Sequence, residues 1–423
     1  MMVDEEQKYF PIKKDPACPL KWNWSTIWTT TGETASCHKC KRVPIDIDKF
    51  DEFHNLPHKI NERKIMLSGK WPTVANGGSG HCEVCKEIED NGGLSDRQQM
   101  KGIPNQVPPE LRNNPTATSV TPRIFELFVS NTCNLQCTYC NTRDSSKINL
   151  EAKKHGPIIF PDGEAVGRYQ YQAPHPQAVG YFRKSLKWYE ANGHKLKRFH
   201  LLGGEPFYMK ETIPVLETLA KVKNRNLEFN IVSNMMCTPA RLEMYIDKIE
   251  QLIRNKNIGR FDLTVSIDGI GPEAEYCRSG MKSDIVTRNM DYIINKKWII
   301  VNVNSVMTSL TIKPYLKLIR YVNEKRKIRR IGQYFGQDIG TRDFLHPMAQ
   351  GGEFWREDME KLINEIEDYD GRSQFQEHLT GIWKSFEKSK PNRNLIDKFK
   401  FYLDELDRRR NTNWRKIYPY LDI

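Results

Sequence analysis

The chain has 423 residues, of which 38% are hydrophobic and 28% charged, and its net charge is +12 because 65 Lys and Arg stand against 53 Asp and Glu. This length suits one domain of barrel size plus a smaller one, and the composition is that of a soluble globular protein. No run of about 18 apolar residues occurs, and residues 1–14 lack the apolar core of a secretory signal. We therefore expect a cytoplasmic protein without a membrane span. The basic balance favours anionic partners such as nucleotides or nucleic acid.

The chain falls into four predicted regions. Residues 1–15 form a polar tail, and residues 16–112 form a cysteine-rich, loop-rich module that closes on a stretch rich in Pro and Asn. Strands alternate with helices over residues 113–340. Residues 341–423 read as a helical C-terminal region.

The alternating region predicts the fold. Apolar runs indicate strands at residues 124–130, 196–202, 227–233, 261–267, 299–307 and 329–335. Thr238 and Pro239 are typical of a helix start, and Leu242, Ile246 and Ile249 then share one helical face. Strands that alternate with helices predict a parallel sheet with right-handed crossovers. We expect an α/β fold, a partial (β/α)6 barrel of the TIM type, with its functional residues at the C-terminal ends of the strands.

The ten cysteines are the main compositional signal. In a reducing compartment cysteines more often ligate metals or do redox chemistry than form disulfides. Eight of them lie in the first third of the chain, and only Cys237 and Cys277 lie beyond it. We expect Cys237 to be a small buried residue. Packing alone does not explain such clustering, so the sequence predicts metal binding.

Three cysteines follow the first predicted barrel strand at close spacing, namely Cys133, Cys137 and Cys140. A [4Fe-4S] cluster is normally held by one thiolate per iron. Three thiolates leave one iron open, and an open position is what catalysis at a metal requires. From spacing alone, a zinc site or three buried thiols remain as alternatives.

The second predicted strand ends in Gly203, Gly204 and Glu205. The two glycines let backbone approach a ligand closely, and the carboxylate can pair with an ammonium group. The spacing is not the G-x-G-x-x-G pattern of a dinucleotide site.

Polar residues also end the third and fourth predicted strands. Asn234 ends the third, while Ser266 and Asp268 end the fourth and are followed by Arg278. Ser266 and Asp268 can hydrogen-bond hydroxyl groups, and Arg278 can hold a carboxylate through two parallel bonds. The alternative is a strand-ending Asp-Gly turn with a surface arginine.

Together these motifs resemble the radical S-adenosylmethionine (SAM) superfamily over roughly residues 123–335. That family's cluster motif has the form C-x3-C-x-aromatic-C, and Tyr139 fills its aromatic position. The resemblance implies an enzyme that reductively cleaves SAM at a [4Fe-4S] cluster into a 5′-deoxyadenosyl radical for C–H activation. It implies these roles: Cys133, Cys137 and Cys140 as catalytic cluster ligands, Tyr139 beside the SAM adenine, Gly203, Gly204 and Glu205 at the amino group, Ser266, Asp268 and Arg278 at the ribose and carboxylate, and Asn234 in the cofactor shell.

A second group of cysteines lies in the N-terminal module, namely Cys18, Cys37, Cys40, Cys82 and Cys85. The arrangement from Cys18 to Cys37 resembles the auxiliary-cluster modules called SPASM and twitch domains, which usually follow the barrel rather than precede it. That resemblance implies a second [4Fe-4S] cluster on Cys18, Cys37, Cys82 and Cys85, with Cys40 able to replace one. The two C-x2-C pairs also fit a structural zinc site, which remains the alternative.

The substrate stays open. Twitch and SPASM proteins often modify peptides or small molecules, which is the first hypothesis. The +12 charge supports a second, a nucleotide or nucleic-acid substrate, and a third is a non-catalytic iron–sulfur or zinc protein that binds nucleic acid. The resemblance further implies a one-electron donor protein such as flavodoxin or ferredoxin. Beside Arg278, Cys277 can donate a hydrogen atom or be structural.

Overall fold

The computed structural model describes residues 11–12, 15–37, 39–101, 107–336, 342–367 and 374–423. Most of the predicted N-terminal tail lies outside these residues. The described part of the chain contains no helix that is long and apolar enough to cross a bilayer.

Within the described residues, one large sheet of nine strands organises the molecule, in the order β11-β10-β8-β7-β6-β4-β1-β2-β3. Neighbouring strands from β4 to β11 pair in parallel, which confirms the predicted α/β fold and partial barrel. The bounds of these strands are β4 (Ile124–Phe128), β6 (Arg198–Leu202), β7 (Glu228–Ser233), β8 (Arg260–Ser266), β10 (Ile299–Val306) and β11 (Gly332–Gly336).

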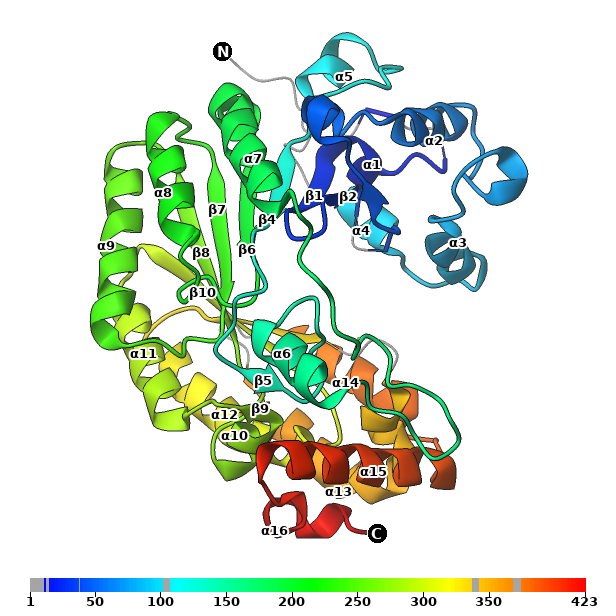
Figure 1. Ribbon diagram of the computed structural model, residues 1–423, viewed down its shortest axis with the longest axis vertical. Coiled ribbons are helices and arrows are strands. Elements are labelled where there is room, and N and C mark those ends of the chain that lie inside the picture. Colours follow the sequence, from blue (N-terminus) through cyan, green and yellow to red (C-terminus); the bar gives the residue numbers. More distant parts are fainter. Residues whose placement is uncertain (1–10, 13–14, 38, 102–106, 337–341, 368–373) are drawn as a thin grey trace.

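Helices connect the parallel strands and flank the sheet (Figure 1). Helix α9 begins as predicted: the Thr238 side chain accepts a hydrogen bond from the Arg241 amide, and Leu242, Ile246 and Ile249 are buried. The connecting helices are α7 (Ala178–Asn192) with the short η4 (Gly193–Lys195), α8 (Thr212–Lys221), α9 (Pro239–Arg254), α11 (Ser283–Asn295) and α12 (Ile312–Arg326).

A ladder of phenylalanines runs across the sheet and explains part of its packing. Phe125, Phe199, Phe229 and Phe261 lie at matching positions on adjacent strands, with ring centroids 5.6, 5.8 and 5.6 Å apart. Trp188 of α7 packs on Phe125 at 4.9 Å. Cross-strand aromatic pairs of this kind stabilise a sheet through burial and ring geometry.

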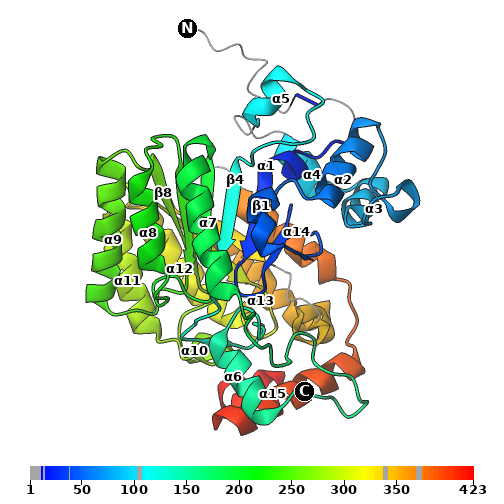
Figure 2. The ribbon, with the colours of Figure 1, turned by 45° about the horizontal axis from the view of Figure 1, so that its top comes forward.

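The N-terminal module extends the sheet. Strand β1 (Trp24–Trp28) pairs in parallel with β4, and β2 (Glu33–Ala35) and β3 (Val43–Pro44) continue it antiparallel. The helices of the module gather beside β1 (Figure 2). They are α1 (Pro19–Asn23), η2 (Ile47–Glu52), α2 (Pro57–Leu67), η3 (Val74–Asn76), α3 (Glu83–Asp90), α4 (Asp96–Lys101) and α5 (Pro109–Asn113). The sheet therefore crosses the expected module boundary, although the helices have a separate apolar cluster around Trp22, Met66 and Leu111.

The C-terminal region is helical, as the sequence predicts. It comprises η5 (Asp343–Leu345), η6 (Pro347–Ala349), α13 (Gly352–Glu365), α14 (Gln374–Phe386), α15 (Arg393–Arg410), α16 (Trp414–Ile417) and η7 (Pro419–Leu421). Between the sheet and α15 lie four short elements (Figure 1): β5 (Gln136–Cys137), α6 (Ser146–His155), α10 (Pro272–Cys277) and β9 (Arg278–Ser279). Of the predicted site residues, they carry Cys137, Cys277 and Arg278.

Candidate active site

The three closely spaced cysteines lie in the loop that follows β4, residues 129–145, which we call the cysteine loop. Its short strand β5 pairs antiparallel with β9, so that Cys137 lies opposite Arg278. The Thr138 amide also donates to the Cys277 carbonyl at 2.8 Å. The loops after β4 and β8 are thus joined at the C-terminal edge of the sheet, where a barrel of this kind places its ligands.

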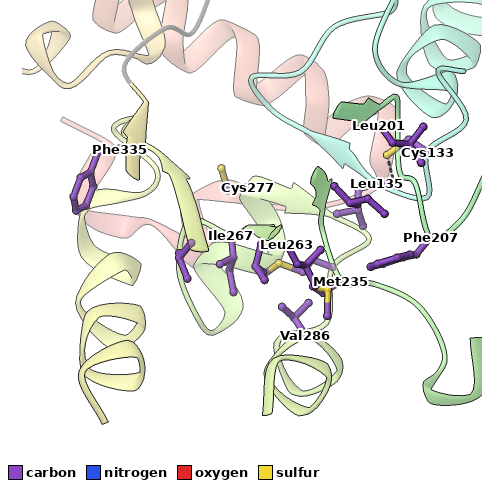
Figure 3. Close-up of a cluster of buried hydrophobic side chains, with 14 of the residues drawn as sticks. Cys133, Leu135, Leu201, Phe207, Met235, Leu263, Ile267, Cys277, Val286 and Phe335 are labelled. Atoms are coloured by element: carbon purple, nitrogen blue, oxygen red, sulfur yellow. Dashed lines mark hydrogen bonds between the residues drawn. The ribbon is translucent and has the colours of Figure 1, made fainter. Parts of the chain in front are cut away.

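The three thiols sit at the boundary between apolar packing and solvent. Cys133 is buried, while Cys137 and Cys140 are half-buried. Leu135 and Leu201 lie next to Cys133, whereas Cys277 lies away from it (Figure 3). Burial and the neighbouring Cys137 raise the pKa of the Cys133 thiol to about 12, and burial likewise raises the pKa of Cys140. Thiols of this kind stay protonated at neutral pH until a bound cation displaces the proton.

The donor chemistry suits a cluster. Among the described residues, no three His, Cys, Asp or Glu side chains converge on one point where they would share a single metal ion. Thiolates that each hold a different iron of one cluster need no such convergence.

A buried polar network joins four of the predicted cofactor residues. The Arg278 Nε donates to the Asp268 Oδ2 at 2.7 Å and its Nη2 to the Ser266 Oγ at 2.6 Å. The Tyr139 hydroxyl also donates to Asp268, and the Val306 amide donates to the Asp268 Oδ1 at 2.8 Å. Burial opposes the charge on Arg278, but Asp268 holds the pKa of the guanidinium well above its usual value. Arg278 is therefore a permanent buried cation beside Cys137.

Gly203 and Gly204 bring β6 against the cysteine loop. A Cβ on Gly203 would lie 2.6 Å from the Ser130 carbonyl oxygen, and one on Gly204 would lie 2.5 Å from that of Thr132. Amides on this side donate to the same carbonyls, from Gly204 to Ser130 at 2.8 Å and from Glu205 to Thr132 at 2.9 Å. The glycines accommodate the backbone of the loop itself, a reason that the sequence alone did not give.

Glu205 is buried and ties the ends of β6 and β7 together. Its carboxylate accepts hydrogen bonds from the Ser233 hydroxyl at 2.7 Å and from the amides of Asn234 and Phe207 at 2.6 and 3.0 Å. Burial raises the pKa of Glu205 in spite of these bonds. The Asn234 side chain donates in turn to Asn134 of the cysteine loop at 3.0 Å. A carboxylate has about four acceptor positions, and donors among the described residues occupy three of those of Glu205.

The sequence missed three residues of the C-terminal region that hold the cysteine loop. The Tyr402 hydroxyl and the Arg342 Nη1 donate to the Thr138 carbonyl at 2.6 and 2.8 Å, and the Arg410 Nη1 donates to the Gln136 carbonyl at 2.9 Å. No local pattern predicts that these side chains contact the cysteine loop. The sequence signals in this region were the run of basic residues at the end of α15, which suggested an anionic partner, and the segment beginning at Tyr402, which resembles the C-terminal end of twitch-type proteins.

Three buried guanidinium groups lie around this loop. Arg278 pairs with Asp268, and Arg410 pairs with Glu151. Arg342 is also buried, and its Nη2 has no hydrogen-bond partner among the described residues. A cluster held by thiolates is anionic, so buried guanidinium groups beside the loop fit its presence.

Part of the second cysteine group comes together, since Cys40 contacts Cys37 and Cys82. Cys18, Cys37, Cys40 and Cys82 are buried, and Cys85 is half-buried. The sulfurs of Cys37 and Cys40 lie 3.4 Å apart, and the Lys21 ammonium donates to the Cys40 sulfur at 3.3 Å. Hydrogen bonds from Cys37 and Cys82, helped by Lys21, lower the pKa of Cys40 well below its usual value. Cys40, expected only as a replacement ligand, therefore lies among the other thiols.

Comparison with known proteins finds a match to one family model. Residues 127–322 match the model of the radical SAM superfamily. No curated protein matches the chain significantly. Similar solved structures include SuiB of Streptococcus suis, at 13% identity and a TM-score of 0.34, covering 74% of this chain and 61% of that one. Native anSMEcpe with bound AdoMet is also similar, at 17% identity and a TM-score of 0.35, covering 63% of each chain. The same protein with AdoMet and the Cp18Cys peptide matches at 16% identity and a TM-score of 0.35, covering 64% of this chain and 63% of that one. The match spans about three fifths of the length of these proteins.

Proposed function

Residues 127–322 belong to the radical SAM superfamily, and from this premise we propose that the protein is an enzyme that cleaves SAM reductively. Cys133, Cys137 and Cys140 are the residues that would hold its [4Fe-4S] cluster. The observation that carries the proposal is their position, in a loop pinned to the C-terminal edge of a parallel sheet and surrounded by buried arginines. When bound, the cluster and SAM supply a one-electron cleavage that yields methionine and a 5′-deoxyadenosyl radical.

The residues around the loop are suited to hold SAM. The Glu205 carboxylate retains an acceptor position for an amino group. Arg278 uses its Nε and Nη2 on Asp268 and Ser266, which leaves Nη1 as the donor for a carboxylate. The half-buried ring of Tyr139 lies beside this pair, with the Arg278 guanidinium 5.8 Å from its centroid, and offers a face for the adenine.

Two substrate classes are compared. The resemblance of the N-terminal cysteines to twitch and SPASM modules favours a peptide or small molecule. The net charge of +12 is the observation that favours a nucleotide or nucleic acid. Retention on DNA or RNA that falls steeply with salt would support the second class, whereas weak retention would support the first. We propose a flavodoxin or ferredoxin as the electron donor in either case.

The proposal is tested by anaerobic reconstitution of the whole protein with iron and sulfide. With dithionite and SAM, we expect 5′-deoxyadenosine, detected by liquid chromatography, and about four oxygen-labile irons for each cluster. Formation of 5′-deoxyadenosine rules out a non-catalytic nucleic-acid-binding protein. A protein that carries no oxygen-labile iron, or that leaves SAM intact, would overturn the assignment.

We also propose a second metal centre on the N-terminal cysteines. A second [4Fe-4S] cluster is favoured, and zinc is the alternative. With every iron ligated, such a cluster would transfer electrons, and with one iron open it could bind substrate. The proposal is supported by the contact between Cys37 and Cys40 and by the burial of four of the five thiols.

Replacing Cys82 with alanine is expected to remove this second metal and to spare SAM cleavage. The reason is that Cys82 is buried beside Cys40, in an apolar cluster that does not include the described residues of the cysteine loop. Iron and zinc per chain are measured by mass spectrometry, and 5′-deoxyadenosine is measured on the same samples. Loss of both signals together would show that the two sites depend on one another.

A further inference from the structure

Helix α2 buries an ionic face. Lys59, Glu62, Arg63 and Met66 are its buried residues, at the spacing that normally places apolar side chains against a core. Charged residues are almost never fully buried unless they are paired. The interior that this helix faces must therefore hold something that compensates charge.

Lys21, which follows Pro19 and Leu20 in α1, completes the buried ionic group. Its ammonium donates to the Glu62 Oε2 at 2.5 Å and to the Cys40 sulfur at 3.3 Å. The side chains of Lys21 and Glu62 are 3% and 2% exposed. A buried cation thus lies directly against one of the clustered thiols.

The described contacts of the other two cations are uncharged. The Lys59 ammonium donates to the Phe53 carbonyl at 2.7 Å and the Thr34 hydroxyl at 3.0 Å. Arg63 donates to the Lys21 carbonyl at 2.8 Å, and its remaining bonds go to Asn55, Thr118 and His54. Within the described part of this group, the basic side chains of Lys21, Lys59 and Arg63 thus face a single buried carboxylate, that of Glu62. Burial and the neighbouring Arg63 lower the pKa of Lys59 well below its usual value, so the charge of Lys59 depends on a nearby anion.

The neighbouring thiols can supply the missing negative charge. Four thiolates that hold a zinc ion or an iron–sulfur cluster leave the centre with a net negative charge. Thiols that stay protonated supply none, so the module reaches this full negative charge only when a bound metal has displaced the protons of all its thiol ligands.

We propose that Lys21, Lys59 and Arg63 are the counter-charge of an anionic metal–thiolate centre that includes Cys40, with Lys21 donating to the Cys40 sulfur. This inference rests on the second metal centre proposed above. Lys21 is a positioning residue: it orients a ligand and stabilises its thiolate form, as groups around a metal site do. In an iron–sulfur centre, the same cations favour the reduced and more negative state.

The test separates this role from that of an ordinary ion pair. Lys21→Met and Glu62→Gln both break the Lys21–Glu62 pair, but only the first removes positive charge from Cys40. In a Cys137→Ala background, where the first cluster lacks a ligand, bound metal reports the second site. Lys21→Met is expected to weaken metal binding about 10–100-fold, whereas Glu62→Gln and Lys21→Arg keep it near the parent value. Lys64→Met is the matched control, because Lys64 lies exposed on the same helix.

Metal binding is measured by competition with a chelator, in separate zinc and iron–sulfide arms, and the reduction potential of the iron-loaded protein is measured in addition. Lys21→Met is expected to shift that potential to more negative values. If Lys21→Met and Glu62→Gln lose the same metal affinity, or if Lys21→Met binds metal as tightly as Lys64→Met, Lys21 does not act as a counter-charge. If Lys21→Met does not fold, Lys59→Met is expected to weaken binding relative to Lys64→Met, and equality would refute the proposal. A parent protein that binds neither metal would refute the second centre itself.

Discussion

Replacing Cys137 with alanine is expected to reduce 5′-deoxyadenosine formation to the background of the assay. The change removes one of the three thiolates that would hold the cluster. Among the described residues of the cysteine loop, no other cysteine lies opposite Arg278, so none can take the place of Cys137. The fold should survive, because β5 pairs with β9 through backbone groups that alanine retains and the Cys137 side chain is only half-buried. We expect a loss of unfolding free energy of about 1 kcal/mol.

A matched control separates chemistry from packing. Cys237 is buried outside the cysteine loop, and its carbonyl, which the variant keeps, accepts from the Asn289 side chain at 2.9 Å. Cys237→Ala makes the same chemical change, the loss of one thiol group, and should retain SAM cleavage. Both variants are compared by circular dichroism, thermal melting and 5′-deoxyadenosine yield. Turnover that persists in Cys137→Ala, or that disappears equally in Cys237→Ala, would contradict the role given to Cys137.

The parallel sheet could be predicted because its signals are local. Strands β4, β6, β7, β8 and β10 are short segments rich in apolar residues, and α9 carries its own cap at Thr238 and an apolar face through Leu242 and Ile249. The pairing of β1 with β4 could not be predicted in the same way, since Trp24 and Ile124 are joined by hydrogen bonding across a hundred residues. Nothing in the local pattern of β1 specifies that partner.

The site shows the same division between local and distant contacts. Spacing identified Cys133, Cys137 and Cys140, and strand ends identified Glu205 and Asp268. Spacing could not show that Asp268 and Arg278 bind one another, nor that Gly203 makes room for the cysteine loop. The sequence offered no reason to connect Thr138 with Arg342 or Tyr402, more than two hundred residues away. The cofactor contacts of these residues stay predictions.

The buried face of α2 illustrates a further limit. A helical stripe containing Lys59, Glu62 and Arg63 reads as a solvated face in sequence, because charged residues are mostly exposed. Its burial becomes understandable only beside the clustered thiols, which lie in other segments of the chain. Hydrophobic periodicity cannot find a core that is built from charges.

Replacing Arg278 with methionine is expected to be the most destabilising single change at the active site. Arg278 and Asp268 are 4% and 0% exposed in their side chains and 2.7 Å apart. Among the described residues, the variant would leave only the Tyr139 hydroxyl and the Val306 amide as donors to the buried Asp268 carboxylate. Removing one partner of a buried ion pair costs about 3–5 kcal/mol, because the other charge stays behind in a medium of low polarity. SAM cleavage should be lost as well, since the donor proposed for the SAM carboxylate is gone.

Two companion variants turn this expectation into a measurement of the pair. Adding Asp268→Asn to Arg278→Met removes the stranded charge, so the double variant should be less destabilised than the sum of the single changes. The matched control is Arg254→Met, which breaks the exposed Arg254–Glu250 pair at 2.7 Å and should change stability by less than about 1 kcal/mol. Unfolding in urea measures all of them. If Arg278→Met and Arg254→Met have the same free energy of unfolding, Asp268 is not held as a buried anion. Arg278→Lys keeps the charge but loses the planar fork, so we expect it to recover more of the stability than of the SAM cleavage.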